Sequence, residues 1–447
     1  MQRFPKRGLG LAAAVLLVAL SALPTASHAQ VNPAAPTPPS ASPPGTLQQA
    51  FEQAWSQHPA SRAWPERRIA ADTERQAAQA WTAQAASLDV RNQSDRPGAK
   101  QGAREWELGV ALPLWWPGQR DRAQRLADDG AHALDAAMLS ARLQLAGAVR
   151  EAWWSWHRAQ AELALAQARV AHAHSLVADV RRRVQAGDLA RADLHQAEGA
   201  QALAEGSQAQ AQSQLLQALQ ALQALQAVPL QGVDAAMPSR TQDWGMPQPE
   251  ALPAEVAEAP IGDATPAPDL AAHPTLLALT QQARAWRSAA ELAATQTHAN
   301  PELTLGTVQS RAQRGEPQQR ALVLGLRLPL GASPAQAVQA AKARADATEL
   351  DAQVASLRHQ LASALQLARG RLQLAQVQHA AAERRARLAR EGLAFFDKSF
   401  RLGETDLPTR LRIAMEAQEA ERQATLTRID VAAATSALRQ AAGLLPQ

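Results

Sequence analysis

The chain has 447 residues, a formal net charge of +4, and neither Cys nor Tyr. The lack of Cys excludes a disulfide scaffold, a Cys-ligated metal or iron–sulfur centre and a thiol nucleophile. A charge this close to neutral disfavours a nucleic-acid-binding protein, so we expect no nucleic-acid partner. Aromatic residues make up 4% of the sequence, and Ala, Leu, Gln and Arg dominate. We therefore expect long helices packed through small side chains.

The N-terminus has the pattern of a secretory signal peptide. Cations near the start precede an apolar run at 9–23, and Ala29 completes a cluster of small residues that suits a cleavage site. We therefore expect residues 1–29 to be removed on export. The run is shorter than the roughly 20 residues of a membrane-spanning helix. Without Cys, the mature N-terminus cannot be lipidated at that residue. Residues 30–46 are rich in Pro, Ser and Ala, which predicts an irregular linker.

The rest of the sequence contains one pattern twice. Residues 107–114 (ELGVALPL) and 323–330 (VLGLRLPL) match at an offset of 216 residues, and a near-constant offset continues through the flanking sequence. Internal similarity of this kind indicates a duplicated architecture. We expect a first repeat at 47–228 and a second at 269–447. Closely spaced Pro residues exclude a long helix between them, so residues 229–268 are expected to form an irregular connector.

Each repeat is expected to contain a helix, a β-hairpin and a long helical hairpin. The first long segment contains no Pro and would extend about 100 Å at 1.5 Å per residue. Apolar residues recur every seven positions, which indicates helix pairing by knobs-into-holes packing. The seams of the second repeat run Leu361, Ala368, Ala375, Ala382, Ala389 and Phe396, and Leu365, Leu372, His379, Ala386, Leu393 and Phe400. The expected strands lie at about 86–93, 105–114, 301–309 and 320–330, the long helices at 118–186 and 334–402, and the return helices at 190–228 and 408–444.

The expected strands carry apolar residues on one face only. Leu108 and Leu322 each begin a run in which every second residue is apolar. Strands of about 9–11 residues with a single apolar face build transmembrane β-barrels. Four strands are too few to close a barrel, so we expect several chains to share one. Trp residues at the strand ends suit an interfacial aromatic belt: Trp106, Trp115 and Trp116.

These features resemble the TolC-like outer-membrane efflux proteins, the outer-membrane factors of tripartite pumps. The resemblance rests on NPELTLG (300–306) and on the Gly turns QAGDLARADL (185–194) and RLGETDLPTRL (401–411). It implies a mostly α protein with a small β part, built from the duplicated repeat. A trimeric, 12-stranded outer-membrane β-barrel would continue into a periplasmic α-helical barrel. The implied setting is the outer membrane of a Gram-negative bacterium, extending into the periplasm. Its implied partners are two other copies, outer-membrane lipid, a periplasmic adaptor (membrane fusion) protein and a proton-driven inner-membrane pump.

The resemblance also assigns roles to the two Gly turns. Eight turn residues are expected to dock the adaptor: Val184, Gly187, Asp188, Leu189, Leu402, Gly403, Glu404 and Thr405. The candidates for a gate that narrows the pore are Asp193, Asp406, Thr409 and Arg412. Some members carry acidic side chains at the positions of Thr409 and Arg412, so this chain departs from a cation-attracting acidic ring there. Pro408 also departs from a smooth helix start.

The segment LPLWWPGQRDRAQRLA (112–127) is similar to the heavy-metal branch of the family, which implies efflux of heavy-metal cations. The His residues lack a spacing that converges three or four ligands, so we expect no bound metal and no cofactor. Walker A, GxSxG and HExxH motifs do not occur in the sequence. We therefore expect a passive conduit for small solutes and no enzyme. One alternative is the outer-membrane channel of a type I protein secretion system. The alternative from another class is a soluble periplasmic coiled-coil structural or adaptor protein.

Overall fold

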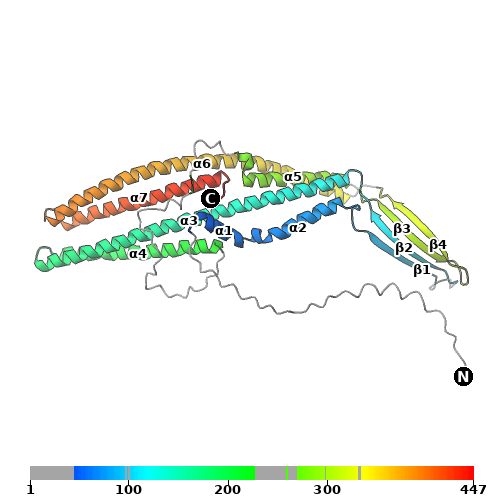
Figure 1. Ribbon diagram of the computed structural model, residues 1–447, viewed down its shortest axis with the longest axis horizontal. Coiled ribbons are helices and arrows are strands. Elements are labelled where there is room, and N and C mark those ends of the chain that lie inside the picture. Colours follow the sequence, from blue (N-terminus) through cyan, green and yellow to red (C-terminus); the bar gives the residue numbers. More distant parts are fainter. Residues whose placement is uncertain are drawn as a thin grey trace, which may run out of the picture. The chain divides into compact units, whose positions relative to one another are not determined.

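Figure 1 shows the computed structural model of the chain, which describes residues 45–95, 98, 101–226, 258–259, 269–296, 298–330 and 334–447. Three of the expected segments lie wholly or mostly outside the described residues. They are the signal peptide at 1–29, the linker at 30–46 and the connector at 229–268. These three interpretations stay predictions.

The described chain is mostly helical with one small sheet, as the sequence pattern predicted. Helices and strands follow one another in nearly the same order in the two halves. In chain order they are α1 (Leu47–Gln57), α2 (Pro59–Gln79), β1 (Ser87–Ser94), β2 (Arg104–Pro113), α3 (Gln119–Ala186), α4 (Arg191–Gln226), the short 3-10 helix η1 (Leu270–Ala272), α5 (Pro274–Thr295), β3 (Glu302–Arg311), β4 (Gln319–Arg327), α6 (Pro334–Arg401) and α7 (Leu407–Ala441).

Two long helices dominate the fold. α3 and α6 each contain 68 residues, which gives a length of about 100 Å at 1.5 Å per residue. Each packs against the helix that follows it, α3 against α4 and α6 against α7, as Figure 1 shows. α5 packs against both α3 and α6, and α2 packs along α3. The two helical hairpins are thereby joined side by side within the chain.

Helix burial follows the heptad seams over most of their length. In α6, Leu365, Ala368, Ala382 and Ala386 are buried, so small residues let the helix axes approach closely. Phe396 was expected to continue one seam, but it is 37% exposed. An α-helix drifts by about 20° per heptad relative to a strict seven-residue repeat, which turns the end of this seam away from its partner.

The largest core lies where α1, α3, α4 and α7 meet. Phe51 of α1, Trp153 and Val149 of α3, Leu222 of α4 and Ile429 of α7 are all buried in it. Large side chains in this core contrast with the Ala-rich seams on either side. α1 therefore packs on the α3–α4 hairpin, in a core that also takes in residues of α7.

The four strands form one antiparallel sheet in the order β1-β2-β3-β4. The β2–β3 pairing joins the two halves of the chain, and Gly109 lies opposite Gly306 in it. A Cβ added to Gly306 would lie 2.9 Å from the carbonyl oxygen of Leu108, so only Gly fits this close approach. β4 ends at Arg327, earlier than expected, because Pro329 has no N–H to extend the ladder.

One face of the sheet is apolar and exposed. The register aligns Leu88, Val110, Leu305 and Leu324 across all four strands. The residues of this face are widely exposed, with Leu322 reaching 82%. Large apolar surfaces open to solvent mark a binding or membrane surface. None of the described helices is both long and apolar enough to cross a membrane.

Candidate functional site

The turn between α3 and α4 contains the first half of the expected docking residues. Gly187 adopts the left-handed conformation, with φ 86°, which ends a helix without the strain that a Cβ would cause. Its N–H donates to the carbonyl of Val184 at 3.1 Å, and the N–H of Asp188 donates to the carbonyl of Arg183 at 2.8 Å. Within the described chain, no atom lies within 4 Å of a Cβ placed on Gly187. The backbone angle, and not crowding, therefore favours Gly here.

The turn between α6 and α7 has the same form. Gly403 has φ 79° and donates its N–H to the carbonyl of Phe400 at 3.2 Å, while Glu404 donates to the carbonyl of Ser399 at 3.0 Å. Pro408 lies in the first turn of α7, where a missing N–H is harmless. The expectation that Pro408 disturbs the helix start is therefore wrong.

The structure brings both turns to the same end of the helical region (Figure 1). Gly187, Asp188, Leu402, Gly403 and Glu404 are exposed there, and Val184, Leu189 and Thr405 are half-buried. A shallow pocket beside the first turn is lined by Arg181, Val184, Gln185, Arg191, Leu194 and His195. This end of the molecule thus offers cationic and apolar side chains on two exposed turns.

The four gate candidates do not form a cluster. No hydrogen bond or ion pair of the described residues joins any two of Asp193, Asp406, Thr409 and Arg412. The carboxylate of Asp193 accepts the N–H of Ala190 at 3.0 Å, which caps the start of α4 and gives Asp193 a structural role. Asp406 and Arg412 are exposed, and Thr409 is half-buried.

Sequence reasoning missed a cluster between the two helical hairpins, which we call the tip clamp: Arg183, Asp397, Phe400 and Arg410. Phe400 of α6 is 4% exposed and packs in a core with residues of α3, α4 and α7. The guanidinium carbons of Arg183 and Arg410 lie 4.9 Å and 5.0 Å from the centroid of its ring, within cation–π range. Nε of Arg410 also pairs with Asp397 at 2.6 Å. Separation of the two hairpins near the turns would have to break the contact between Arg183 and Phe400, whereas the contacts of Arg410 hold α6 to α7 within one hairpin.

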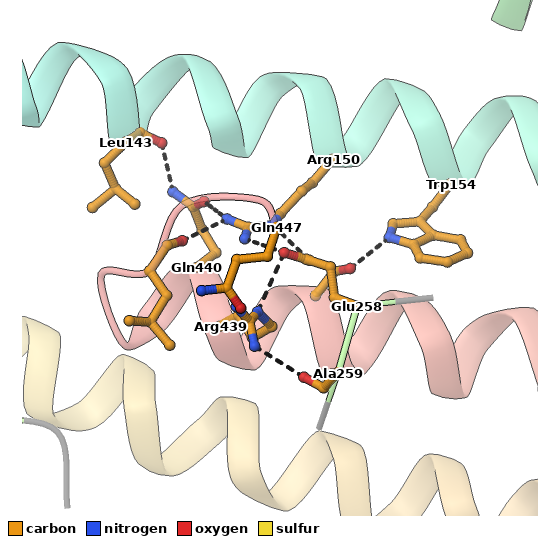
Figure 2. Close-up of polar contacts among 10 residues, drawn as sticks. Leu143, Arg150, Trp154, Glu258, Ala259, Arg439, Gln440 and Gln447 are labelled. Carbon is orange, nitrogen blue, oxygen red and sulfur yellow. Dashed lines mark hydrogen bonds and ion pairs between the residues drawn. The ribbon is translucent and has the colours of Figure 1, made fainter. Parts of the chain in front are cut away.

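A second missed cluster is buried where the connector meets the helices, and we call it the Glu258 cluster (Figure 2). Arg150 of α3 donates through Nε and Nη2 to the two carboxylate oxygens of Glu258, at 2.9 Å and 2.6 Å. Nε of Arg439 in α7 lies 3.3 Å from the same carboxylate. Arg150, Glu258 and Arg439 are 3%, 5% and 5% exposed. One buried carboxylate is therefore shared by two buried guanidinium groups.

The two guanidinium groups of the Glu258 cluster also donate hydrogen bonds to uncharged oxygens. Arg439 donates to the carbonyl of Ala259 at 3.0 Å and to Gln447 Oε1 at 2.8 Å. Arg150 donates to the carbonyl of Leu444 at 3.1 Å. These bonds attach residues 258–259 and the C-terminal residues to α3 and α7. No periodic pattern surrounds Glu258 in the sequence, because it falls in a Pro-rich segment.

Of the His residues, His157 has the most perturbed environment. Its ring lies 4.7 Å from that of Trp153 and 4.6 Å from that of Trp156, and burial lowers its pKa to about 4. It is therefore neutral at neutral pH. Among the described residues, no group of three or more His, Cys, Asp or Glu side chains is placed to hold a metal ion.

The Trp residues at the strand ends fall into two sets. Trp106 is exposed on the apolar face of β2. Trp115 and Trp116, at the helical end of the sheet, donate their indole N–H groups to the carbonyls of Ala80 and Ala299, at 3.0 Å and 2.9 Å. Indole rings therefore lie near both ends of the sheet, but only Trp106 is on its apolar face.

Comparisons with known proteins agree with this geometry. Residues 52–227 match a family model described as outer membrane efflux protein. The fold is shared with a membrane protein from Pseudomonas aeruginosa, at 19% identity over 89% of this chain and 93% of that chain, with a TM-score of 0.66. The VceC outer membrane protein from Vibrio cholerae has 18% identity over 89% and 96% of the two chains, with a TM-score of 0.65. The CmeC outer membrane channel from Campylobacter jejuni has 12% identity over 89% and 85%, with a TM-score of 0.67. No curated protein sequence matches the chain.

Proposed function

We propose that this chain, whose residues 52–227 match the outer membrane efflux protein family, is the outer-membrane channel of a tripartite efflux system. The family is one of transport proteins, which confirms both the resemblance drawn from the sequence and the expectation of a non-enzymatic protein. In this proposal three copies form a passive conduit that uses no cofactor. The energy comes from an inner-membrane pump that is driven by protons.

The observation that carries the proposal is the exposed apolar face of the sheet. In water, a face with Leu322 at 82% exposure would be an aggregation hazard, whereas facing lipid it is favourable. β1 and β4 are the edges of the sheet, and unpaired edges are not tolerated in hydrocarbon. Three copies joined edge to edge would supply twelve strands and leave no free edge.

The helices support the periplasmic part of the proposal. A passage walled by α3, α4, α6 and α7 from three copies would extend about 100 Å from the sheet side to the turns, judged from 68 residues at 1.5 Å each. That length suits a crossing of the periplasm. A signal peptide at 1–29 would direct the export of the chain, and lipidation at Cys is not part of the proposal.

The two turns are proposed to dock a periplasmic adaptor. Support comes from the exposure of Gly187, Asp188, Gly403 and Glu404 at one end of the helices, and from the mixed cationic and apolar pocket beside the first turn.

The gate of the channel is proposed to lie just above the turns. The tip clamp supports this position, because Phe400 links α6 to Arg183 of α3 and to Arg410 of α7. Opening would require the two hairpins to separate and the cation–π contact between Arg183 and Phe400 to break. The earlier gate candidates Asp406, Thr409 and Arg412 stand beside the clamp in sequence and are proposed to line the same constriction.

The substrate proposal is heavy-metal cations, and it rests on the similarity of residues 112–127 to the heavy-metal branch of the family. The alternative within the same fold is the outer-membrane channel of a type I protein secretion system. The alternative of a soluble periplasmic coiled-coil or adaptor protein leaves the exposed apolar sheet without a role.

The test is a deletion strain of the bacterium that makes this protein, with and without a complementing copy. We expect the deletion to increase the cell-associated amount of toxic heavy-metal cations and to lower resistance to them, with both effects reversed by the wild-type chain. Unchanged accumulation of all small solutes, together with loss of one secreted protein from the medium, would contradict efflux and favour the type I alternative.

A further inference from the structure

Charge is distributed unequally between the two faces of the sheet. The pairing register places every strand carboxylate on the face opposite the exposed leucines: Asp89, Glu105, Glu107 and Glu302. That face also carries Arg91 and Arg327, which pair with Glu107 at 3.6 Å and with Glu302 at 3.8 Å. The apolar face has no carboxylate on any of its four strands.

Cations occur on the apolar face only at its loop end. In β2 the face runs from Leu112 to Trp106 and ends at Arg104, and in β4 it runs from Leu326 to Leu322 and ends at Arg320. Arg311 ends the same face of β3. We call Arg104, Arg311 and Arg320 the cationic rim.

The guanidinium groups of the cationic rim make no ion pair with any described residue, and Asp95 and Glu316 line a pocket with Arg104 and Arg311 without pairing with them. Arg104 and Arg311 are directly paired across β2 and β3, and like charges at directly opposite positions destabilise a sheet. Arg104 and Arg320 have no ion-pair partner among the described residues. Arg311 donates to the carbonyl of Gly102 at 3.3 Å, but its Nε is buried without a hydrogen-bond partner in the described chain. The rim therefore presents three guanidinium groups to an anion from outside the chain.

We propose that the cationic rim binds the phosphate groups of the anionic glycolipid of the outer leaflet, lipid A. This inference rests on the proposed function, because the loop end faces the outer leaflet only if the helices lie in the periplasm. At about 3.4 Å per residue, Arg320 lies roughly 20 Å beyond Leu326 along β4, close to the height of about 25 Å of a lipid-facing apolar band. If the acyl chains of lipid A pack against the leucines of the apolar face, its phosphate groups lie at the level of the cationic rim.

The chemistry of the rim fits phosphate in particular. Guanidinium groups bind phosphate oxygens through paired N–H donors, and three of them on adjacent strands can share one diphosphorylated headgroup. Trp106, between the leucines and Arg104, suits the boundary between acyl chains and headgroups. A free phosphate ion could contact only the cationic rim. A lipid could contact the rim through its phosphate groups and the apolar face through its acyl chains, so we expect the lipid to bind more tightly.

The test measures lipid A binding by the full-length protein, extracted from outer membranes in an uncharged detergent, by native mass spectrometry. The variant is Arg104→Gln with Arg320→Gln, and the matched control is Arg91→Gln with Arg327→Gln on the opposite face. We expect the rim variant to bind diphosphorylated lipid A at least tenfold more weakly and the control to bind it as the wild type does. Dephosphorylated lipid A should bind the wild type as weakly as lipid A binds the rim variant.

Four outcomes would overturn the proposal: unchanged binding of lipid A by the rim variant, equal binding of the two lipids, an equal loss in the control variant, or displacement of lipid A by an equal concentration of inorganic phosphate. Fractionation of the cells that make each protein distinguishes a failure of the rim proposal from a failure of the proposed function. If the wild type is recovered from the outer membrane and the rim variant binds normally, the rim assignment alone is wrong. If the wild type is absent from that fraction, the proposed channel itself is wrong.

Discussion

Replacing Glu258 with Gln removes the carboxylate that two buried guanidinium groups share. Arg150 and Arg439 are 3% and 5% exposed, so neither can recover its lost partner from bulk water. Gln keeps the size of the side chain and one acceptor oxygen but carries no charge. The substitution therefore leaves two buried cations with only neutral oxygens around them.

Breaking a buried ion pair from one side lowers stability by about 3–5 kcal/mol. Because Gln retains part of the hydrogen bonding, we expect Glu258→Gln to lower the free energy of unfolding by about 3 kcal/mol per chain, the low end of that range. The matched control is Asp135→Asn, which removes a carboxylate 3.0 Å from Arg68 in a pair whose side chains are 52% and 49% exposed. An exposed pair contributes less than about 1 kcal/mol.

Urea-induced unfolding of the detergent-extracted protein, followed by tryptophan fluorescence, measures both variants. Trp153 and Trp154 lie in the core near the Glu258 cluster, so their emission reports on this region. A loss below about 1 kcal/mol in Glu258→Gln would refute the reasoning that the buried charges depend on this carboxylate. A loss of the same size in Asp135→Asn would show that charge removal at any position has this effect.

Three further predictions concern the turns, the sheet and the central core. Gly187→Pro and Gly403→Pro each remove an N–H that donates across the turn and exclude a positive φ, so we expect normal export and trimer formation but loss of efflux-dependent resistance. Unchanged resistance in both variants would remove the docking proposal. Leu324→Arg should reduce the amount of assembled protein in outer membranes, because Leu324 lies near the middle of the apolar face of β4 and Arg at mid-membrane costs about 2–4 kcal/mol per subunit. Val323→Arg on the opposite face should assemble, and the reverse result would mean that the two faces are inverted. Burial lowers the pKa of His157 to about 4 from 6.5, so the unfolded chain binds the extra proton first and stability should fall by about 3 kcal/mol as the pH drops from 6.5 to 4. An unfolding series against pH in which His157→Phe keeps the same slope would contradict this.

The long helices and the strands follow from local patterns in the sequence. Heptad spacing and the absence of Pro in 119–186 leave few alternatives to a helix, and alternation around Leu108 and Leu322 leaves few alternatives to strands. The ends of the helices and strands were harder to predict, because each end depends on one or two residues. α7 stops at Ala441, before the expected end, since Gly443 takes φ 78° and Leu444 returns its N–H to the carbonyl of Arg439 at 3.0 Å.

The clusters that join distant segments could not be predicted in this way. Arg183 and Phe400 come from different helical hairpins, and no period in the sequence relates them. Phe400 did lie in a predicted seam, so its burial was expected, but the two Arg side chains over its ring were not. For Asp193 the sequence predicted a role that the structure does not support. Its position after a turn suggested a gate residue, but its carboxylate caps the start of α4.

The trimeric channel is tested most sharply by the native mass of the protein after fractionation of an expressing Gram-negative host. We predict a homotrimer in the outer-membrane fraction, released only by detergent, because the exposed apolar face of the sheet requires lipid and the two sheet edges require other copies. A monomer or dimer in the soluble periplasm would contradict the channel and leave a coiled-coil structural protein.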